Sequence, residues 1–92
     1  MSDFCYLLTG ASKGIGRSVL DLLIKKNSNI IVLVRNSQTL SNYKNYKNLK
    51  IFQGDIRNKK ILKKIFDFAK SKKISIKYLI NNAGQRQRKK FL

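Results

Sequence analysis

Three glycines lie close together in the segment TGASKGIG, from Thr9 to Gly16. An unbroken apolar run, residues 4–8, precedes them, and a helical pattern follows. At such a junction the helix amino terminus presents unpaired backbone N–H groups and the positive end of its dipole, which together attract an anion. Glycine removes the side chains that would hold a phosphate away from this backbone. The segment therefore predicts a phosphate-binding turn.

Each glycine has a distinct expected part in that turn. In a dinucleotide-binding turn the first glycine permits the tight turn, the second lets the ligand approach, and the third lets the helix pack against the strand. We assign these parts to Gly10, Gly14 and Gly16, in that order. The spacing is G-x-x-x-G-x-G rather than the commoner G-x-G-x-x-G, and the alternative is a glycine-rich turn that binds no ligand.

The elements that would position the turn follow from apolar patterns. Unbroken apolar runs at 4–8 and 30–34 are typical of parallel strands that are covered on both faces. Between them, apolar residues at helical spacing predict a helix that ends near Lys26. The predicted stripe consists of Ile15, Val19, Leu22 and Leu23.

The same alternation continues through the second half. Segment 36–48 is rich in Asn and Ser and predicts a short or broken helix, and 49–52 predicts a third strand whose Lys50 indicates an edge position. Segment 57–73 predicts a strong helix, and 77–81 predicts a fourth strand. The stripe expected for that helix is Ile61, Leu62, Ile65, Phe66 and Ala69. This order predicts an α/β fold, one domain over 1–92, with a parallel sheet built by right-handed crossovers.

Charge is the most unusual property of the composition. The 92 residues include 21 Lys and Arg but only four acidic residues, a net charge of +17. Such a charge fits a nucleic-acid or anionic-surface partner, whereas the abundance of Lys, Asn and Ile along the whole chain favours a general compositional bias.

Cys5 is the only cysteine and there is no histidine, which excludes a disulfide framework and a Cys/His metal site. No apolar run reaches the length of a membrane span, and we expect a cytoplasmic protein.

Three motifs together resemble the short-chain dehydrogenase/reductase family, the NAD(P)-dependent oxidoreductases with a Rossmann-type fold. They are TGASKGIG at 9–16, GDI at 54–56 and NNAG at 81–84. The resemblance spans essentially the whole chain. It implies a partial Rossmann domain with about four strands in the order 3-2-1-4 and flanking helices. In the complete enzyme it implies hydride transfer between the cofactor and a carbonyl or alcohol substrate.

The resemblance also implies parts for the two later motifs. Asp55 would meet the adenine amino group, with the Ile56 backbone beside it; the alternative for Asp55 is a helix N-cap near Arg57. The NNAG segment would brace the centre of the sheet and line the adenine ribose. Without the resemblance, NNAG would be a strand-ending turn.

The end of the second strand bears on which cofactor is bound. NAD-selective sites place an acid there for the ribose 2′-hydroxyl, whereas NADP-selective sites use basic residues for the 2′-phosphate. This chain has Arg35 and Asn36 at that point. Lys13 resembles the second basic position of NADP-preferring relatives, and Ser12 adds a hydroxyl donor. NADP is therefore the predicted cofactor, in preference to NAD.

The predicted cofactor-binding residues are Gly10, Ser12, Lys13, Gly14, Ile15, Gly16, Arg35, Asn36, Asp55, Ile56, Asn82, Ala83 and Gly84.

No catalytic residue is predicted. The family pattern Tyr-x-x-x-Lys, with its Ser and Asn, falls beyond NNAG, so we expect a fragment or truncated product and leave its own activity open. Tyr43 and Lys47 have this spacing but precede the third strand, where a solvated face is the simpler interpretation.

The fourth strand would lack its next neighbour, which predicts self-association through Tyr78 to Ile80. The alternative function is a small basic protein that binds nucleic acid or an anionic surface.

Overall fold

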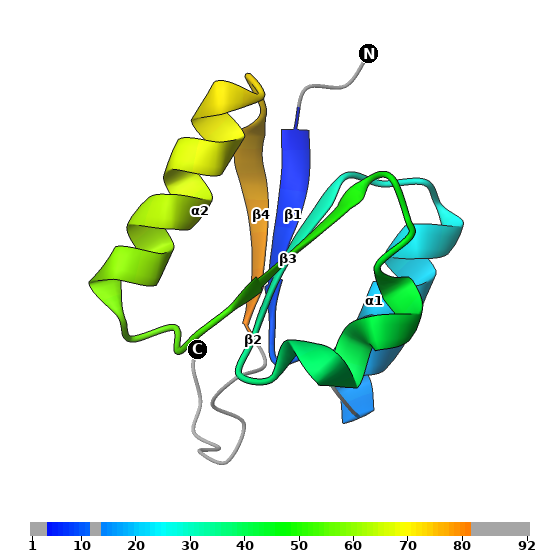
Figure 1. Ribbon diagram of the computed structural model, residues 1–92. Coiled ribbons are helices and arrows are strands. Elements are labelled where there is room, and N and C mark those ends of the chain that lie inside the picture. The colour runs from blue at the N-terminus through cyan, green and yellow to red at the C-terminus, as the bar shows by residue number, and fades with distance from the viewer. Residues whose placement is uncertain (1–3, 12–13, 82–92) are drawn as a thin grey trace.

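The computed structural model describes residues 4–11 and 14–81. Parallel strands alternate with helices along the chain (Figure 1). The elements are β1 (Phe4–Thr9), α1 (Gly14–Lys25), β2 (Ile30–Val34), the 3₁₀ segment η1 (Ser37–Tyr43), β3 (Leu49–Gln53), α2 (Lys59–Ser71) and β4 (Ser75–Asn81). The third strand lies at an edge and the segment before it forms only a broken helix, both as predicted.

The four strands form one parallel sheet in the order β3-β2-β1-β4. In its register, Leu8 of β1 lies beside Val32 of β2 and Ile80 of β4. The helix α1 and the segment η1 cover one face, and α2 covers the other (Figure 1). The predicted α/β class and the order 3-2-1-4 are confirmed. All strands point the same way, so their carboxyl ends meet at one edge of the sheet.

A separate apolar core lies on each face. Leu8 and Val32 pack with Leu20 on the α1 face, while Leu7 and Leu33 pack with Ile65 on the α2 face. All five residues of β2 are buried, as expected for a strand covered on both sides. Burial of this apolar area is the main favourable contribution to the fold.

The predicted stripe of α1 is right for Val19 and Leu23 and wrong for Ile15 and Leu22. Ile15 is 75% and Leu22 53% exposed, while the buried residues are Gly16, Leu20 and Leu23. These three also follow helical spacing, and the partly buried Val19 packs against the same core. The helix turns this face inward because Gly16 is small enough to contact the turn at Gly10. Close backbone packing, rather than apolar area, sets the rotation of α1.

The prediction for α2 is right in its centre and wrong at one flank. Ile65 and Ala69 are buried, whereas Phe66 is 53% exposed. Phe68, which was not predicted to face inward, packs its ring 5.8 Å from that of Phe52 on β3. The Phe68 side of α2 thus packs toward β3, whereas Phe66 faces outward.

The outer edge of β4 has no strand beside it in the described part of the chain. Tyr78 and Leu79 are 45% and 60% exposed on this strand. The ring of Tyr78 stacks on Tyr6 of β1 with 4.9 Å between ring centres.

Within residues 4–11 and 14–81, no helix is long and apolar enough to cross a membrane.

Candidate dinucleotide-binding site

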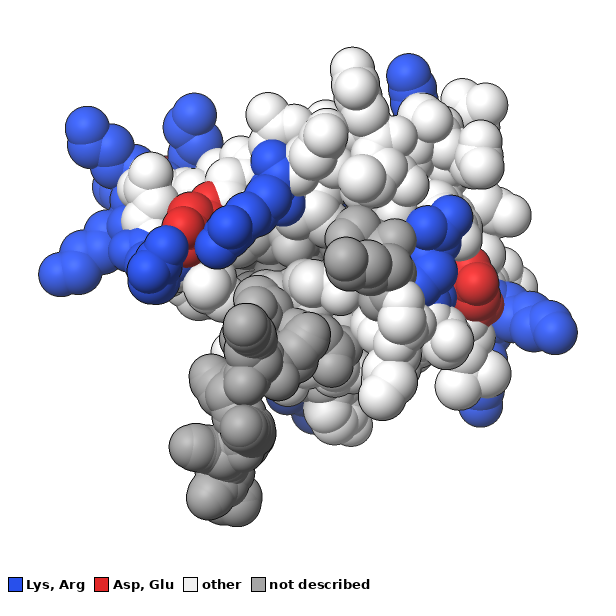
Figure 2. All heavy atoms as spheres, turned by 90° about the horizontal axis from the view of Figure 1, so that it is seen from below, with Lys and Arg blue, Asp and Glu red and all other residues white. Residues whose placement is uncertain are grey.

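The carboxyl edge of the sheet brings together several of the predicted site residues. Gly10 follows β1, Arg35 and Asn36 follow β2, and Asp55 follows β3. Figure 2 looks onto this end of the molecule and shows Lys and Arg gathered toward its two sides, with acidic side chains among them. Residues from three separate parts of the sequence thus border one surface.

The glycine turn has the geometry predicted for it. Gly10 and Gly14 have φ angles of 70° and 62°, in the left-handed region that favours glycine. A Cβ atom on Gly16 would overlap the Gly10 carbonyl oxygen and lie 3.1 Å from the Ala11 Cα atom. A Cβ atom on Gly14 would meet nothing within 4 Å. Gly16 therefore serves helix packing, and Gly14 borders open space at the start of α1.

The first turn of α1 borders this open space. Its first backbone N–H groups have no partner within the helix, as at any helix start, and the turn carries no acidic side chain. Ile15, in this turn, is 75% exposed. An anion at this point would meet N–H donors and the positive end of the helix dipole. The residues present fit the pyrophosphate of a dinucleotide.

The two residues after β2 differ in what their side chains do. The Arg35 side chain is 76% exposed and extends from the sheet edge. The Asn36 side chain caps η1, because its Oδ1 atom accepts a hydrogen bond from the Gln38 backbone N–H at 3.0 Å. Asn36 thus has a structural part that the sequence prediction did not include. No acidic residue stands at 34–36 to accept from a ribose hydroxyl.

Asp55 is held by Arg57. Its Oδ1 atom accepts from the Arg57 backbone N–H at 2.9 Å and from Nε at 3.1 Å, and its Oδ2 atom accepts from Nη2 at 2.8 Å. Arg35 Nη2 lies 3.8 Å from the same Oδ2 atom. The hydrogen bonds from Arg57 hold the pKa of the Asp55 carboxyl well below its usual range, and they raise the pKa of Arg57.

The alternative role considered for Asp55, that of N-cap of the following helix, is wrong. Asn58 caps α2 instead, its Oδ1 atom accepting from the Lys60 backbone N–H at 2.8 Å. The reason is spacing, since Asp55 stands four residues before Lys59, the first residue of the helix. Ile56, between these groups, is partly buried against the core on the α2 face.

The remaining predicted residues are Ser12, Lys13, Asn82, Ala83 and Gly84, and they lie outside the described residues. Asn81, the first residue of the NNAG motif, ends β4. The hydroxyl of Thr9 donates to Asn81 Oδ1 at 2.7 Å, which ties β4 to β1 beside the glycine turn.

A polar cluster next to the turn escaped the sequence prediction. Arg17 Nε donates to the Tyr43 hydroxyl at 2.8 Å, and that hydroxyl donates to Asp21 Oδ1 at 2.6 Å. The Arg17 guanidinium also lies 5.0 Å from the Tyr43 ring centre. No sequence signal connects position 43 with 17 and 21, because only the fold brings η1 against α1. The Tyr43 hydroxyl, considered above for a Tyr-Lys pair, is occupied in this cluster.

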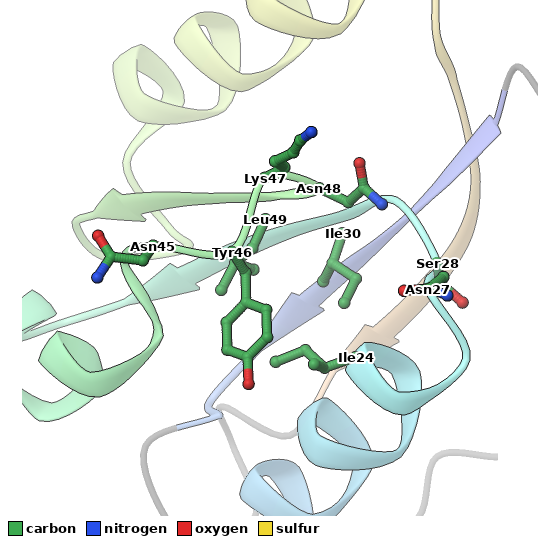
Figure 3. A pocket seen from close by; sticks show the side chains of 9 residues that line it. All are labelled: Ile24, Asn27, Ser28, Ile30, Asn45, Tyr46, Lys47, Asn48 and Leu49. Atoms are coloured by element: carbon green, nitrogen blue, oxygen red, sulfur yellow. The ribbon is translucent and has the colours of Figure 1, made fainter.

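A hollow of about 380 Å³ lies at the opposite edge of the sheet (Figure 3). It opens between the end of α1 and the segment that leads into β3, where Ile30 and Leu49 begin their strands. Tyr46 and Ile24 extend toward this space from its two sides (Figure 3). The hollow is separated from the glycine turn by the length of the strands and does not belong to the candidate site.

Among the described residues no three Cys, Asp or Glu side chains gather as a metal site would require.

Comparison with known proteins points to one family. A family model described as short chain dehydrogenase matches residues 5–92. An uncharacterized oxidoreductase of Staphylococcus aureus (strain USA300) is 27% identical over 88 residues, which cover 92% of this chain and 38% of the relative. The chain thus spans well under half the length of this curated relative.

Solved structures of the same shape agree with this match. A 4-hydroxyisoleucine dehydrogenase complexed with NADH is 28% identical, with a TM-score of 0.73 over 88% of this chain and 33% of the other. A protein from Bacillus thuringiensis described as a candidate 3-oxoacyl-reductase is 33% identical, with a TM-score of 0.73 over 96% of this chain and 39% of the other. The similarity covers nearly all of this chain but only 33% and 39% of the two solved proteins.

Proposed function

Because the chain belongs to the short-chain dehydrogenase family, we propose that residues 1–92 are the cofactor-binding amino-terminal part of an NADP(H)-dependent oxidoreductase. The observation that carries this proposal is the glycine turn, with left-handed Gly10 and Gly14 and with Gly16 packed on the Gly10 carbonyl. This geometry clears backbone N–H groups for a pyrophosphate. The bound nicotinamide would supply hydride transfer to a carbonyl, or accept hydride from an alcohol, in the complete enzyme.

The preference for NADP rests on the end of β2. Arg35 extends from it with a largely exposed guanidinium, and no acid is present at 34–36. A guanidinium suits a phosphate monoester, which it can bind through two parallel hydrogen bonds. The solved 4-hydroxyisoleucine dehydrogenase, which has a similar fold, is complexed with NADH. That cofactor is a property of the other protein and does not identify the cofactor of this chain. On this chain, Arg35 supports NADP, with Lys13 and Ser12 as further proposed contacts.

The remaining parts of the proposed site follow the family pattern. Asp55 and the Ile56 backbone would border the adenine, and Asn82, Ala83 and Gly84 would line its ribose. The Asp55 carboxyl is ionised at the pH of a cell, as an ordinary aspartate is, and can accept a hydrogen bond; Arg57 lowers its pKa further. We place the protein in the cytoplasm, on the argument that its one cysteine, buried in β1, needs no oxidising compartment. Cell fractionation tests that placement.

The test compares dissociation constants of NADPH and NADH for the chain and for Arg35→Asp. We expect the wild-type chain to bind NADPH at least about tenfold more tightly, and the variant to lose or reverse this preference. Lys64→Asp, a change of equal charge on an exposed position of α2, is the matched control and should keep the preference. Equal affinities in the wild type would overturn the NADP assignment.

Salt dependence separates this function from that of a basic nucleic-acid-binding protein. Binding to a phosphate backbone weakens steeply as salt rises, because many counterions are released. A dinucleotide in a glycine-lined site should depend on salt far less. Tight binding of a DNA or RNA oligomer with a steep salt slope, together with no dinucleotide binding, would favour the alternative function.

Self-association through β4 is also proposed. Its outer edge offers unpaired backbone groups, and Tyr78 and Leu79 expose apolar surface beside them. We expect sedimentation to detect oligomers that dissociate when Leu79 is replaced by Lys. A monodisperse monomer at high protein concentration would contradict this.

A further inference from the structure

We propose that Arg57 is a second ligand for the cofactor's 2′-phosphate, paired with Arg35, and that Asp55 is the residue that positions it. This inference rests on the proposed NADP(H) function and extends it to a residue outside the predicted site. The ligand chemistry is a phosphate monoester on the 2′-oxygen of an adenosine ribose.

The two guanidinium groups converge on one carboxylate oxygen. Asp55 Oδ2 lies 2.8 Å from Arg57 Nη2 and 3.8 Å from Arg35 Nη2. The first contact is a hydrogen bond, and the second is an ion pair beyond hydrogen-bond length. Both arginine side chains remain more than three-quarters exposed. Two cations therefore stand side by side at the carboxyl edge of β2 and β3, with their surfaces open to solvent.

The backbone beneath this pair is tied across the two strands. The Gly54 N–H donates to the Val34 carbonyl at 2.9 Å, directly before Asp55 and Arg35. A second bond joins the same two strand ends: the Ser37 N–H, two residues after Arg35, donates to Oε1 of Gln53, the last residue of β3, at 2.8 Å. These bonds hold the ends of β2 and β3 at a constant separation. The positions from which both arginines extend are therefore set by the sheet.

Asp55 orients Arg57 without neutralising the pair. The carboxylate takes hydrogen bonds from Nε and Nη2 on one edge of the guanidinium, and an arginine has five N–H donors in all. Donors on the Nη1 side remain for a ligand. Two guanidinium charges against one carboxylate leave an excess positive charge, which complements a phosphate dianion.

The sequence order explains why Arg57 is absent from the predicted site. It follows β3 rather than β2, where the 2′-phosphate contact was expected. The adjacency of β2 and β3, together with the turn at Asp55, carries it back to Arg35. This is a contact that only the sheet order creates.

The experiment uses adenosine 2′,5′-bisphosphate, adenosine 3′,5′-bisphosphate and 5′-AMP as probes of the full 92-residue chain. The two bisphosphates carry equal charge, so their comparison removes the contribution of the general positive field. We expect the wild type to prefer the 2′,5′ isomer and Arg57→Ala to weaken that isomer at least about tenfold, with 5′-AMP changed less than about twofold. Lys60→Ala, an exposed cation three residues along, is the matched control and should change neither isomer selectively.

Two further variants keep the test decisive if Arg57→Ala unfolds. Arg57→Lys keeps the charge but lacks the planar fork, and should recover only part of the 2′,5′ preference. Asp55→Asn should weaken the 2′,5′ isomer selectively, because Arg57 loses its orientation. If Asp55 acted only on the adenine, Asp55→Asn would weaken the binding of all three probes together. That result would overturn the role of Asp55 in positioning Arg57.

Failure of this inference differs from failure of the proposed function. A wild-type preference for the 2′,5′ isomer that Arg57→Ala and Arg57→Lys both retain would remove Arg57 from the site and leave NADP binding intact. A wild type that binds no adenosine probe, or binds the two isomers equally, would overturn the proposed cofactor and this inference with it.

Discussion

The hydroxyl of Thr9 donates a hydrogen bond to Asn81 Oδ1 at 2.7 Å, across 72 positions of sequence. Thr9 ends β1 directly before the glycine turn and is buried, while Asn81 ends β4. The bond therefore fixes the last described residue against the base of the candidate site. It gives the Asn81 side chain a structural role at the start of the NNAG motif.

Replacing Thr9 by Val should destabilise the fold. Valine has nearly the same shape but cannot donate, so the Asn81 amide oxygen loses this partner; the expected loss is about 1–2 kcal/mol in the free energy of unfolding. Urea titration measures it. Thr9→Ser, which keeps a hydroxyl, should lose less. A larger loss in Thr9→Ser than in Thr9→Val would mean that packing of the methyl group, rather than the hydrogen bond, matters at this position.

Gly16 and Gly14 should respond differently to alanine. Gly16→Ala forces a Cβ atom onto the Gly10 carbonyl, so α1 must move off the turn, at a cost of about 3 kcal/mol. Gly14→Ala enters open space and carries only the strain of a left-handed alanine, about 1 kcal/mol. Chemical denaturation of both variants checks the order. A larger loss at Gly14 would show that the contact between α1 and the turn is more yielding than its geometry indicates.

Tyr43→Phe should loosen η1 from α1. The variant removes the hydroxyl that accepts from Arg17 and donates to Asp21, and should lower the free energy of unfolding by about 1 kcal/mol. Amide hydrogen exchange in η1 should rise more than in β2. Tyr46→Phe, a half-exposed tyrosine three residues on, is the control and should leave exchange in η1 as it is. Unchanged exchange in Tyr43→Phe would contradict a bracing part for this cluster.

Asp55 should make stability depend on pH on the acid side. Its pKa is lower in the folded chain than in the unfolded chain, where an aspartate has a pKa of about 3.9. The unfolded state therefore binds the proton first, so the contribution is fully present above that value and is lost as the pH falls toward the folded pKa. Thermal unfolding between neutral pH and pH of about 2 should lose stability less steeply in Asp55→Asn. Parallel curves for the two proteins would contradict this.

Much of the architecture was determined by the sequence alone. The unbroken apolar runs at 4–8 and 30–34 predicted buried parallel strands, and the glycines predicted the tight turn at Gly10 and the close packing of α1 at Gly16. That Gly14 lets a ligand approach stays a prediction. These features depend on local chemistry: backbone freedom at glycine and continuous apolarity along a strand. Such signals are present in a short stretch of chain and do not need their partners to be known.

Tertiary structure alone decided that Ile15 and Leu22 of α1 point outward, that Arg35 lies near Asp55, and what Tyr43 contacts. The apolar pattern favoured Ile15 and Leu22, yet the sheet takes Gly16 and Leu20 because the turn at Gly10 leaves room only for a residue without a side chain. The approach of Arg57 to Arg35 depends on β3 lying beside β2, and that of Tyr43 to Arg17 depends on η1 lying over α1. These contacts join segments distant in sequence, and their geometry exists only once the crossovers have placed the strands side by side.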